Sequence, residues 1–207
     1  RMHMGLSAAA ARQRSVELLT KLRIAEAASV CSQYPHQLSG GMKQRIVIAM
    51  ALAGKPDLII ADEPTTALDV TVQAQIILLL ANLVKEQGLA LLLITHDMGV
   101  VAQSCDKVAV LYAGRLVESR DVNTLFKQPR HPYTRALIDC IPQGDTIRHG
   151  LTGIPGSVPT VSEYPSGCRY HPRCPRRQPI CERETPPAEA VRGGLAFCHF
   201  AGEAEAA

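Results

Sequence analysis

Two adjacent carboxylates follow a short apolar run near the middle of the chain. Residues 58–61 read Leu-Ile-Ile-Ala, the pattern of a buried strand, and Asp62 and Glu63 come directly after them. The carboxyl ends of parallel strands are the places where α/β folds bind ligands. Phosphoryl transfer needs charge neutralisation and a positioned water, so paired acids there can supply a metal ligand and a general base. Taken alone, the same pair also fits a solvated turn.

A second feature suited to phosphate lies upstream, at Leu38-Ser39-Gly40-Gly41, where an apolar helical run over 46–53 begins. Backbone N–H groups at a helix start are unpaired and lie at the positive end of the helix dipole, so this end binds anions. Glycine lets a phosphate approach the backbone closely, and serine adds a hydroxyl donor. The pattern therefore predicts a phosphate-binding helix start.

A third candidate follows a second buried strand, predicted over 89–95, which presents His96 between Thr95 and Asp97. A histidine at such a position is structural more often than functional when it stands alone. Between the two predicted strands, Asp69 precedes a helical run over 72–87. Asp69 can therefore cap that helix, whatever other role it has.

At these residues the chain resembles the ATP-binding subunits of ABC transporters. LSGGM resembles the signature motif of that family, LIIADEPTTALD its Walker B strand and D-loop, and ITHD its switch-histidine motif. The three motifs stand in the order and spacing of the family. Met42 departs from the commonest signature, which has glutamine there; the change removes one possible hydrogen bond and leaves the backbone donors.

The resemblance implies a role for each residue at the strand ends. Asp62 would hold Mg²⁺ through a water, Glu63 would polarise the attacking water as the general base, and His96 would contact the γ-phosphate of ATP. The resemblance also implies that the signature residues bind the γ-phosphate of the ATP held by a partner subunit. These residues are Ser39, Gly40 and Gly41. Asp69, in the D-loop, would reach across to the same partner.

One motif of such an ATPase is missing from the sequence. No G-x-x-x-x-G-K-[ST] loop occurs, and Gly54-Lys55 lacks both the first glycine and the following Ser or Thr. Neither the glutamine loop nor the aromatic adenine platform of the family is found before residue 36. We therefore expect the C-terminal part of a longer protein, lacking the Walker A region and inactive alone. A natural relic of an ATPase fits less well, because the downstream catalytic residues are all present.

The elements that position these residues predict an α/β fold. A helix is expected from the N-cap Ser7 to Leu22, and strand, helix, strand, helix, strand then follow to Tyr112, with a hairpin turn at Ala113-Gly114. This order predicts a parallel-sheet core preceded by a helical subdomain, the C-terminal part of an ABC-type P-loop NTPase domain. We assign residues 1–120 to it.

Residues 121–207 are predicted to form a small Pro- and Cys-rich extension. A short helical run over 122–127 precedes Arg130-His131-Pro132-Tyr133-Thr134 and another helix. This stretch resembles the C-terminal extension of the ABC ATPases that serve dipeptide and oligopeptide importers. The resemblance covers nearly the whole chain, from about residue 12 to 200.

Four of the seven cysteines lie in this extension, separated by five, six and sixteen residues: Cys168, Cys174, Cys181 and Cys198. Four thiolates are the ligand set of an Fe–S cluster or a structural zinc, and a core-poor segment needs such a cross-link. The tight C-x₂₋₄-C pair of zinc sites is absent. In some dipeptide importers the matching cysteines hold a [4Fe–4S] cluster, which we therefore favour. Zinc, free thiols and disulfides stay open, as does replacement of one ligand by His171 or His199.

Charge and hydropathy limit the classes of function that remain open. The net charge is +3, and the arginines gather in the tail rather than along a stripe, so nucleic acid is not an expected partner. The longest purely apolar run, 46–53, is far shorter than the about 18 residues of a membrane span, and the start shows no signal-peptide pattern. We expect a peripheral protein on the cytoplasmic face of the inner membrane.

The function predicted from all this is ATP binding and hydrolysis, with Mg²⁺, in an importer of dipeptides, oligopeptides or a related solute. The resemblance implies a head-to-tail pair with a second, related ABC ATPase subunit, two transmembrane permease subunits, and a periplasmic or extracellular solute-binding protein. A DNA-repair or chromosome-maintenance ATPase shares two motifs, but the Arg-His-Pro-Tyr extension and the absence of heptads disfavour it. A metal-binding interaction module is the alternative if the chain is complete.

Overall fold

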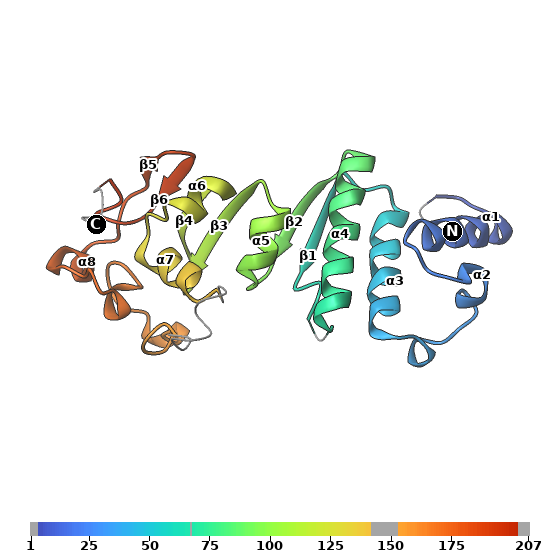
Figure 1. Ribbon diagram of the computed structural model, residues 1–207, viewed down its shortest axis with the longest axis horizontal. Coiled ribbons are helices and arrows are strands. Elements are labelled where there is room, and N and C mark those ends of the chain that lie inside the picture. Colours follow the sequence, from blue (N-terminus) through green and yellow to red (C-terminus); the bar gives the residue numbers. More distant parts are fainter. Residues whose placement is uncertain (1–3, 67, 142–152, 203–207) are drawn as a thin grey trace. The chain divides into compact units, whose positions relative to one another are not determined.

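The computed structural model describes residues 4–66, 68–141 and 153–202 (Figure 1). The chain divides into two compact units, Arg1–His96 and Asp97–Ala207, and each is described by itself. The domain boundary predicted between residues 120 and 121 falls inside the second unit. A division of function at that point stays a prediction.

The first unit combines helices with one parallel strand pair. Its elements are α1 (Ala8–Lys21), α2 (Ala27–Val30), η1 (Pro35–Gln37), α3 (Gly40–Ala53), β1 (Leu58–Asp62), α4 (Val70–Gln87) and β2 (Ala90–Ile94). Three of these helices begin at a side-chain cap, in which an oxygen accepts a backbone N–H of the first turn. Ser7 caps α1, Ser39 caps α3, and Asp69 caps α4. Gly88, at φ 66°, ends α4 in the left-handed conformation. No described helix has both the length and the apolarity that crossing a membrane requires.

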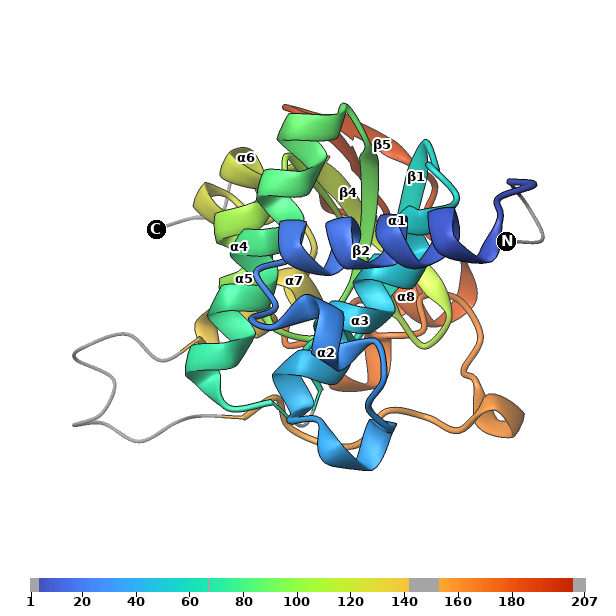
Figure 2. The same ribbon diagram turned by 90° about the vertical axis from the view of Figure 1, so that its right-hand side faces the viewer.

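Strands β1 and β2 run parallel, in a register that pairs Leu58 with Ala90 and Asp62 with Ile94. On one face, Ile59 and Ala61 are buried in a core to which α4 contributes much of the apolar surface. Helix α3 joins that core through Ile48, Ala49 and Leu52, while α1 crosses over α3 (Figure 2). The predicted strand, helix and parallel strand are therefore confirmed.

The other face of this strand pair is apolar and exposed. Leu58, Ile60, Leu92 and Ile94 point to it, and each retains between 45% and 61% of its exposure. Parallel sheets are normally covered on both faces. This face is as apolar as the covered face of a parallel sheet, yet its four side chains remain exposed among the described residues.

The second unit contains a four-stranded antiparallel sheet in the order β3-β4-β6-β5. Its elements are α5 (Met98–Ser104), β3 (Lys107–Tyr112), β4 (Arg115–Asp121), α6 (Val122–Lys127), α7 (Pro132–Asp139), η3 (Val161–Glu163), η4 (His171–Arg173), α8 (Pro179–Arg183), β5 (Glu189–Val191) and β6 (Gly194–Ala196). The predicted hairpin at Ala113-Gly114 is confirmed, since β3 pairs antiparallel with β4. The expected place of β3 in the parallel layer is not, because β4 is its only partner among the described strands. The turn explains this pairing, because Ala113 and Gly114 both have positive φ, the geometry of a tight hairpin.

The hairpin β5–β6 was not predicted from the sequence. Gly194 presses against the backbone of Ser119 on β4, so closely that a Cβ would collide with the Ser119 carbonyl. The extension thereby completes the sheet begun by β3 and β4. Its residues also enter the core of the unit, since Tyr170, Ala196 and Ala201 are each at most 2% exposed.

Candidate functional site

The carboxyl ends of β1 and β2 bring two predicted catalytic residues together. Glu63 follows β1 with a φ of 45°, and its backbone N–H donates to the carbonyl of Ile94 at 2.9 Å, which ties the two strand ends. His96 lies two residues beyond β2, and its Nδ1 is 2.7 Å from Oε1 of Glu63. A carboxylate only accepts, so Nδ1 is the donor. Thr66 donates to the second carboxylate oxygen at 3.3 Å.

The electrostatics of this pair suit a proton acceptor. The hydrogen bond from His96 lowers the pKa of Glu63, with smaller contributions from the charge of His96 and from Thr66, against the opposing effect of desolvation. Glu63 is therefore a carboxylate at neutral pH. The side chain of His96 is 85% exposed, so it can also meet a ligand. Asp62 is exposed at the end of β1, beside Glu63.

The predicted signature residues form the start of α3. The Ser39 hydroxyl accepts the backbone N–H of Met42 at 3.3 Å. A Cβ on Gly41 would lie 2.8 Å from Cγ1 of Val72, so glycine is required where α3 meets α4. Asp69 caps α4 by accepting the N–H of Val72 at 2.9 Å. The structure thus joins the signature to the segment that begins at Asp69, and it confirms the capping role expected of Asp69.

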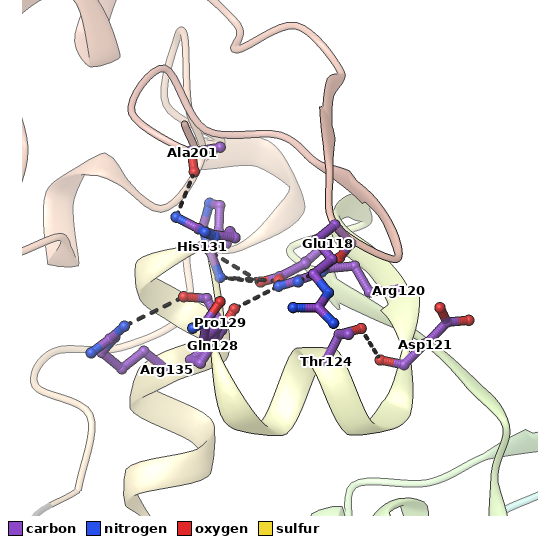
Figure 3. Close-up of polar contacts among 11 residues, drawn as sticks. Glu118, Arg120, Asp121, Thr124, Gln128, Pro129, His131, Arg135 and Ala201 are labelled. Atoms are coloured by element: carbon purple, nitrogen blue, oxygen red, sulfur yellow. Dashed lines mark hydrogen bonds and ion pairs between the residues drawn. The ribbon is translucent and has the colours of Figure 1, made fainter. Parts of the chain in front are cut away.

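A buried polar cluster in the second unit was missed by the sequence analysis (Figure 3). Glu118 and Arg120 of β4 are 0% and 2% exposed and lie 3.1 Å apart. Glu118 also accepts the backbone N–H groups of Arg130, at 3.0 Å, and of His131, at 2.9 Å. Arg120 donates to the carbonyls of Gln128 and Arg192. The cluster ties β4 to the start of α7 and to the β5–β6 hairpin.

The four cysteines of the extension line one cavity, together with the three histidines His131, His171 and His199. A tight turn shapes it, since Gly167 has a φ of 64° and the N–H of Cys168 donates to the Cys181 carbonyl at 2.9 Å. All four are free thiols, as are the other described cysteines. Burial raises the pKa of Cys168 and Cys174, and that of Cys198 to about 11.

Metal binding is not evident in this arrangement. In the part of the chain that the structure describes, no group of three or more His, Cys, Asp or Glu side chains is placed to hold a metal ion. A single zinc needs its sulfur ligands about 2.3 Å from one point. The thiols gather around a shared cavity without meeting that condition.

Comparison with known proteins gives these sites a context. The ABC transporter family model matches residues 3–66, and the model described as oligopeptide/dipeptide transporter, C-terminal region, matches residues 117–181. The dipeptide transport ATP-binding protein DppD of Escherichia coli K12 is 46% identical over 201 residues, 97% of this chain. The oligopeptide transport ATP-binding protein OppD of Salmonella typhimurium is 48% identical over 193 residues, 93% of this chain. The chain belongs to the ABC transporter family.

Solved structures of ABC ATP-binding cassettes share the fold. The cassette MJ0796, in a dimeric post-hydrolysis state with ADP and Pi, has a TM-score of 0.50 and 34% identity, covering 57% of this chain and 50% of its own. CbiO1 from Clostridium perfringens has a TM-score of 0.53 and 32% identity, covering 60% and 49%. The predicted fold class is thereby confirmed. This ABC chain spans 62% of the length of DppD and 57% of that of OppD.

Proposed function

We propose that this chain works within a longer ABC ATPase that hydrolyses ATP to drive the import of dipeptides, oligopeptides or a related solute. The contact of 2.7 Å between Glu63 and His96, at the carboxyl ends of two parallel strands, carries this proposal. Relatives named for dipeptide and oligopeptide transport support the solute class. Their greater length, and the lack of a G-x-x-x-x-G-K-[ST] loop in this sequence, support a polypeptide with a further phosphate-binding segment.

The strand ends provide the chemistry of hydrolysis. Glu63, held as a carboxylate by His96, accepts a proton from the attacking water as it approaches the γ-phosphate. His96 orients the carboxylate through Nδ1, and because its side chain is 85% exposed, a phosphate can approach the ring. Asp62 offers an exposed carboxylate, a hard oxygen donor that suits Mg²⁺. When bound, Mg²⁺ neutralises charge on the phosphates.

The start of α3 provides the second half of the site, in our proposal on the nucleotide of a partner subunit. The N–H groups of Gly40 and Gly41 belong to the first turn of α3, where a helix supplies no internal acceptors. The Ser39 oxygen accepts from Met42 and keeps its own O–H for donation to a phosphate. Because Gly41 packs on Val72, a phosphate held here is linked mechanically to Asp69, which would contact the partner.

The proposed reaction geometry and the relatives named for peptide transport support the following assembly. We propose a head-to-tail pair with a second, related ABC ATPase subunit, bound to two transmembrane permease subunits that receive solute from a binding protein. The chain would then sit peripherally on the cytoplasmic face of the inner membrane. Nucleic acid has no place in this assembly.

The deciding experiment replaces the base in the longer protein, assembled with its permeases. Glu63→Gln keeps the shape of the side chain and removes the proton acceptor, so ATP hydrolysis should fall by about 10²–10⁴-fold while ATP binding persists. Glu86→Gln is the matched control, an exposed residue of α4 outside the site, and should hydrolyse ATP at the unmodified rate. Near-normal hydrolysis by Glu63→Gln would remove Glu63 from the role of base.

For the extension we propose a [4Fe–4S] cluster held by Cys168, Cys174, Cys181 and Cys198, with zinc as the alternative. Four cysteines around one cavity fit the donor chemistry of a cluster, in which four thiolates share the ligation of several irons. The absence of a single-ion arrangement among the described side chains disfavours zinc more than it disfavours a cluster. When bound, the cluster would add its binding energy to the folding of the extension.

Anaerobic purification of the longer protein tests this proposal. The protein should be brown, with four iron and four sulfide per chain, as the stoichiometry of the cluster requires. Cys174→Ser should lose the colour and the protease resistance of the extension, whereas Cys105→Ser, outside the cavity, should keep both. One zinc in a colourless protein would select the alternative, and a metal-free protein with a resistant extension would contradict both.

A further inference from the structure

The second unit contains an open cleft that the reaction proposed at Glu63 does not use. Its volume is about 730 Å³, and small-molecule sites typically measure about 300–1,000 Å³. The lining comes mainly from α7, from residues 153–156 and from residues 172–177. The cleft adjoins the four-cysteine cavity, because Tyr170 and Cys174 line both. Its size and its concave form suit a small molecule.

The charges that line this cleft are unbalanced. Among the described residues, one lining residue is acidic, Asp139, whereas four are arginines: Arg135, Arg173, Arg176 and Arg177. Four positive charges and one negative charge leave a formal charge of +3. A cleft lined by one sign of charge focuses the electrostatic potential and attracts ligands of the opposite sign. The lining therefore favours an anion.

Neutral groups hold Arg173 in place. Its Nε donates to the Pro155 carbonyl at 2.7 Å, its Nη2 to the Ile154 carbonyl at 3.0 Å, and its Nη1 to the Tyr112 hydroxyl at 3.3 Å. None of these acceptors carries a formal charge, and no carboxylate of the described residues forms an ion pair with this guanidinium. Arg173 thus fixes one side of the cleft and keeps its positive charge unbalanced there.

The other arginines differ in how firmly they are held. Arg135 is half-buried, and its Nη2 donates to the Pro129 carbonyl at 3.4 Å (Figure 3). Arg177 is exposed, and only its backbone N–H, which donates to the Cys174 carbonyl at 3.3 Å, has a bonding partner among the described residues. Its side chain can therefore move toward a ligand, while Arg135 is already anchored.

We propose that this cleft binds a small molecule that carries at least two oxyanion groups, either phosphates or carboxylates. The planar guanidinium group binds both kinds of oxyanion through paired N–H donors. A formal charge of +3 on the lining matches a ligand with two or three negative charges. Ala136, Ile154 and Pro175 add apolar surface for the body of such a molecule. The inference depends neither on the proposed hydrolysis of ATP nor on a metal.

Two substitutions change the charge of the cleft in opposite directions. Arg177→Gln removes a positive charge from a side chain without described contacts, so the fold should be kept. Asp139→Asn removes the one acidic group among the described lining residues. It lies in the last turn of α7, where the helix dipole disfavours a negative charge, so this change should not destabilise the helix. The matched controls are Arg183→Gln and Asp106→Asn, at exposed residues of the same unit outside the cleft.

Isothermal titration calorimetry on the full 207-residue chain, at one fixed ionic strength, measures binding of two probes. Citrate supplies carboxylates, and fructose 1,6-bisphosphate supplies phosphates; uncharged fructose should not bind. Arg177→Gln should weaken binding by about two- to fivefold and Asp139→Asn should tighten it by a similar factor, as is typical for one exposed charge pair. Both controls should match the unmodified protein. The probe that binds more tightly identifies the preferred oxyanion.

Three results would overturn the inference. The first is binding of neither probe, and the second is equal weakening by Arg177→Gln and Arg183→Gln, which would indicate attraction to the surface charge as a whole. The third is binding that neither cleft variant changes, which would place the anion elsewhere in the chain. Near-ultraviolet circular dichroism of each variant checks that the fold is kept. If Arg177→Gln fails to fold, tighter binding by Asp139→Asn alone decides the question.

Discussion

Glu63 and His96 are 33 residues apart in the chain and 2.7 Å apart in the fold, with Nδ1 of the imidazole donating to Oε1 of the carboxylate. The contact exists because β1 and β2 are parallel neighbours in register, so their carboxyl ends coincide. It gives the proposed base a fixed orientation and a lowered pKa. The same imidazole is exposed, so a phosphate that engages it also acts on the base.

The pH dependence of hydrolysis should report this contact. His96 lowers the pKa of Glu63, so the carboxylate form persists to lower pH than that of an ordinary glutamate. Removing the imidazole in His96→Ala should raise that pKa and move the acidic limb of kcat/KM toward neutral pH. Thr66→Ala removes a weaker contributor and should move the limb less, in the same direction. An acidic limb that does not move in His96→Ala would disconnect the two residues.

The 207-residue chain alone should bind ATP weakly and hydrolyse none above background. It contains the strand-end acids and the signature, but no phosphate-cradling loop that would hold the β- and γ-phosphates against them. Equilibrium binding of a fluorescent ATP analogue and a phosphate-release assay measure both properties. Turnover that disappears in Glu63→Gln would show that the isolated chain is catalytic, against this expectation.

Local signals made most of the first unit predictable. The helix that became α4 is bounded by a capping aspartate and a left-handed glycine, Asp69 and Gly88, and both are readable without any tertiary information. The strands β1 and β2 are continuous apolar runs flanked by polar residues. The contact of Glu63 with His96 is different, because it depends on strand register, which the motif alone does not specify.

The second unit was harder to predict because the contacts that define it join residues far apart in the sequence. Strands of three residues, such as β5 and β6, are too short for a periodic signal, and the Gly193-Gly194 turn was their only local mark. No local signal in the sequence marks Glu118 as a buried residue. Its burial is possible only because backbone N–H groups twelve and thirteen residues away supply donors, and Arg120 supplies the charge.

Gly41→Ala should destabilise the first unit. The added Cβ would lie 2.8 Å from Val72, so α3 and α4 would have to separate slightly, and overpacking of this kind costs about 1–3 kcal/mol. Gly54→Ala is the matched control, because no atom lies within 4 Å of its Cβ position and its φ of −79° suits alanine. Urea denaturation followed by far-ultraviolet circular dichroism compares them. Equal midpoints would mean that Val72 moves aside without cost.

The buried pair of Glu118 and Arg120 gives the sharpest stability prediction for the second unit. Glu118→Ala leaves the guanidinium of Arg120 buried without its carboxylate and removes the acceptor of two backbone N–H groups. Breaking a buried pair from one side typically costs about 3–5 kcal/mol. Asp106→Asn, an exposed change in the same unit, should stay within about 0.5 kcal/mol of the unmodified protein.

A double variant distinguishes the free-energy cost of a buried, unpaired charge from the cost of lost packing. Glu118→Leu with Arg120→Met removes both charges and restores apolar volume, so it should be more stable than Glu118→Ala, as buried pairs replaced by hydrophobic residues often are. Denaturation can be followed by near-ultraviolet circular dichroism, because Tyr112, Tyr133 and Tyr170 form an aromatic cluster in this unit. A loss below about 1 kcal/mol in Glu118→Ala would mean that water or another group reaches Arg120.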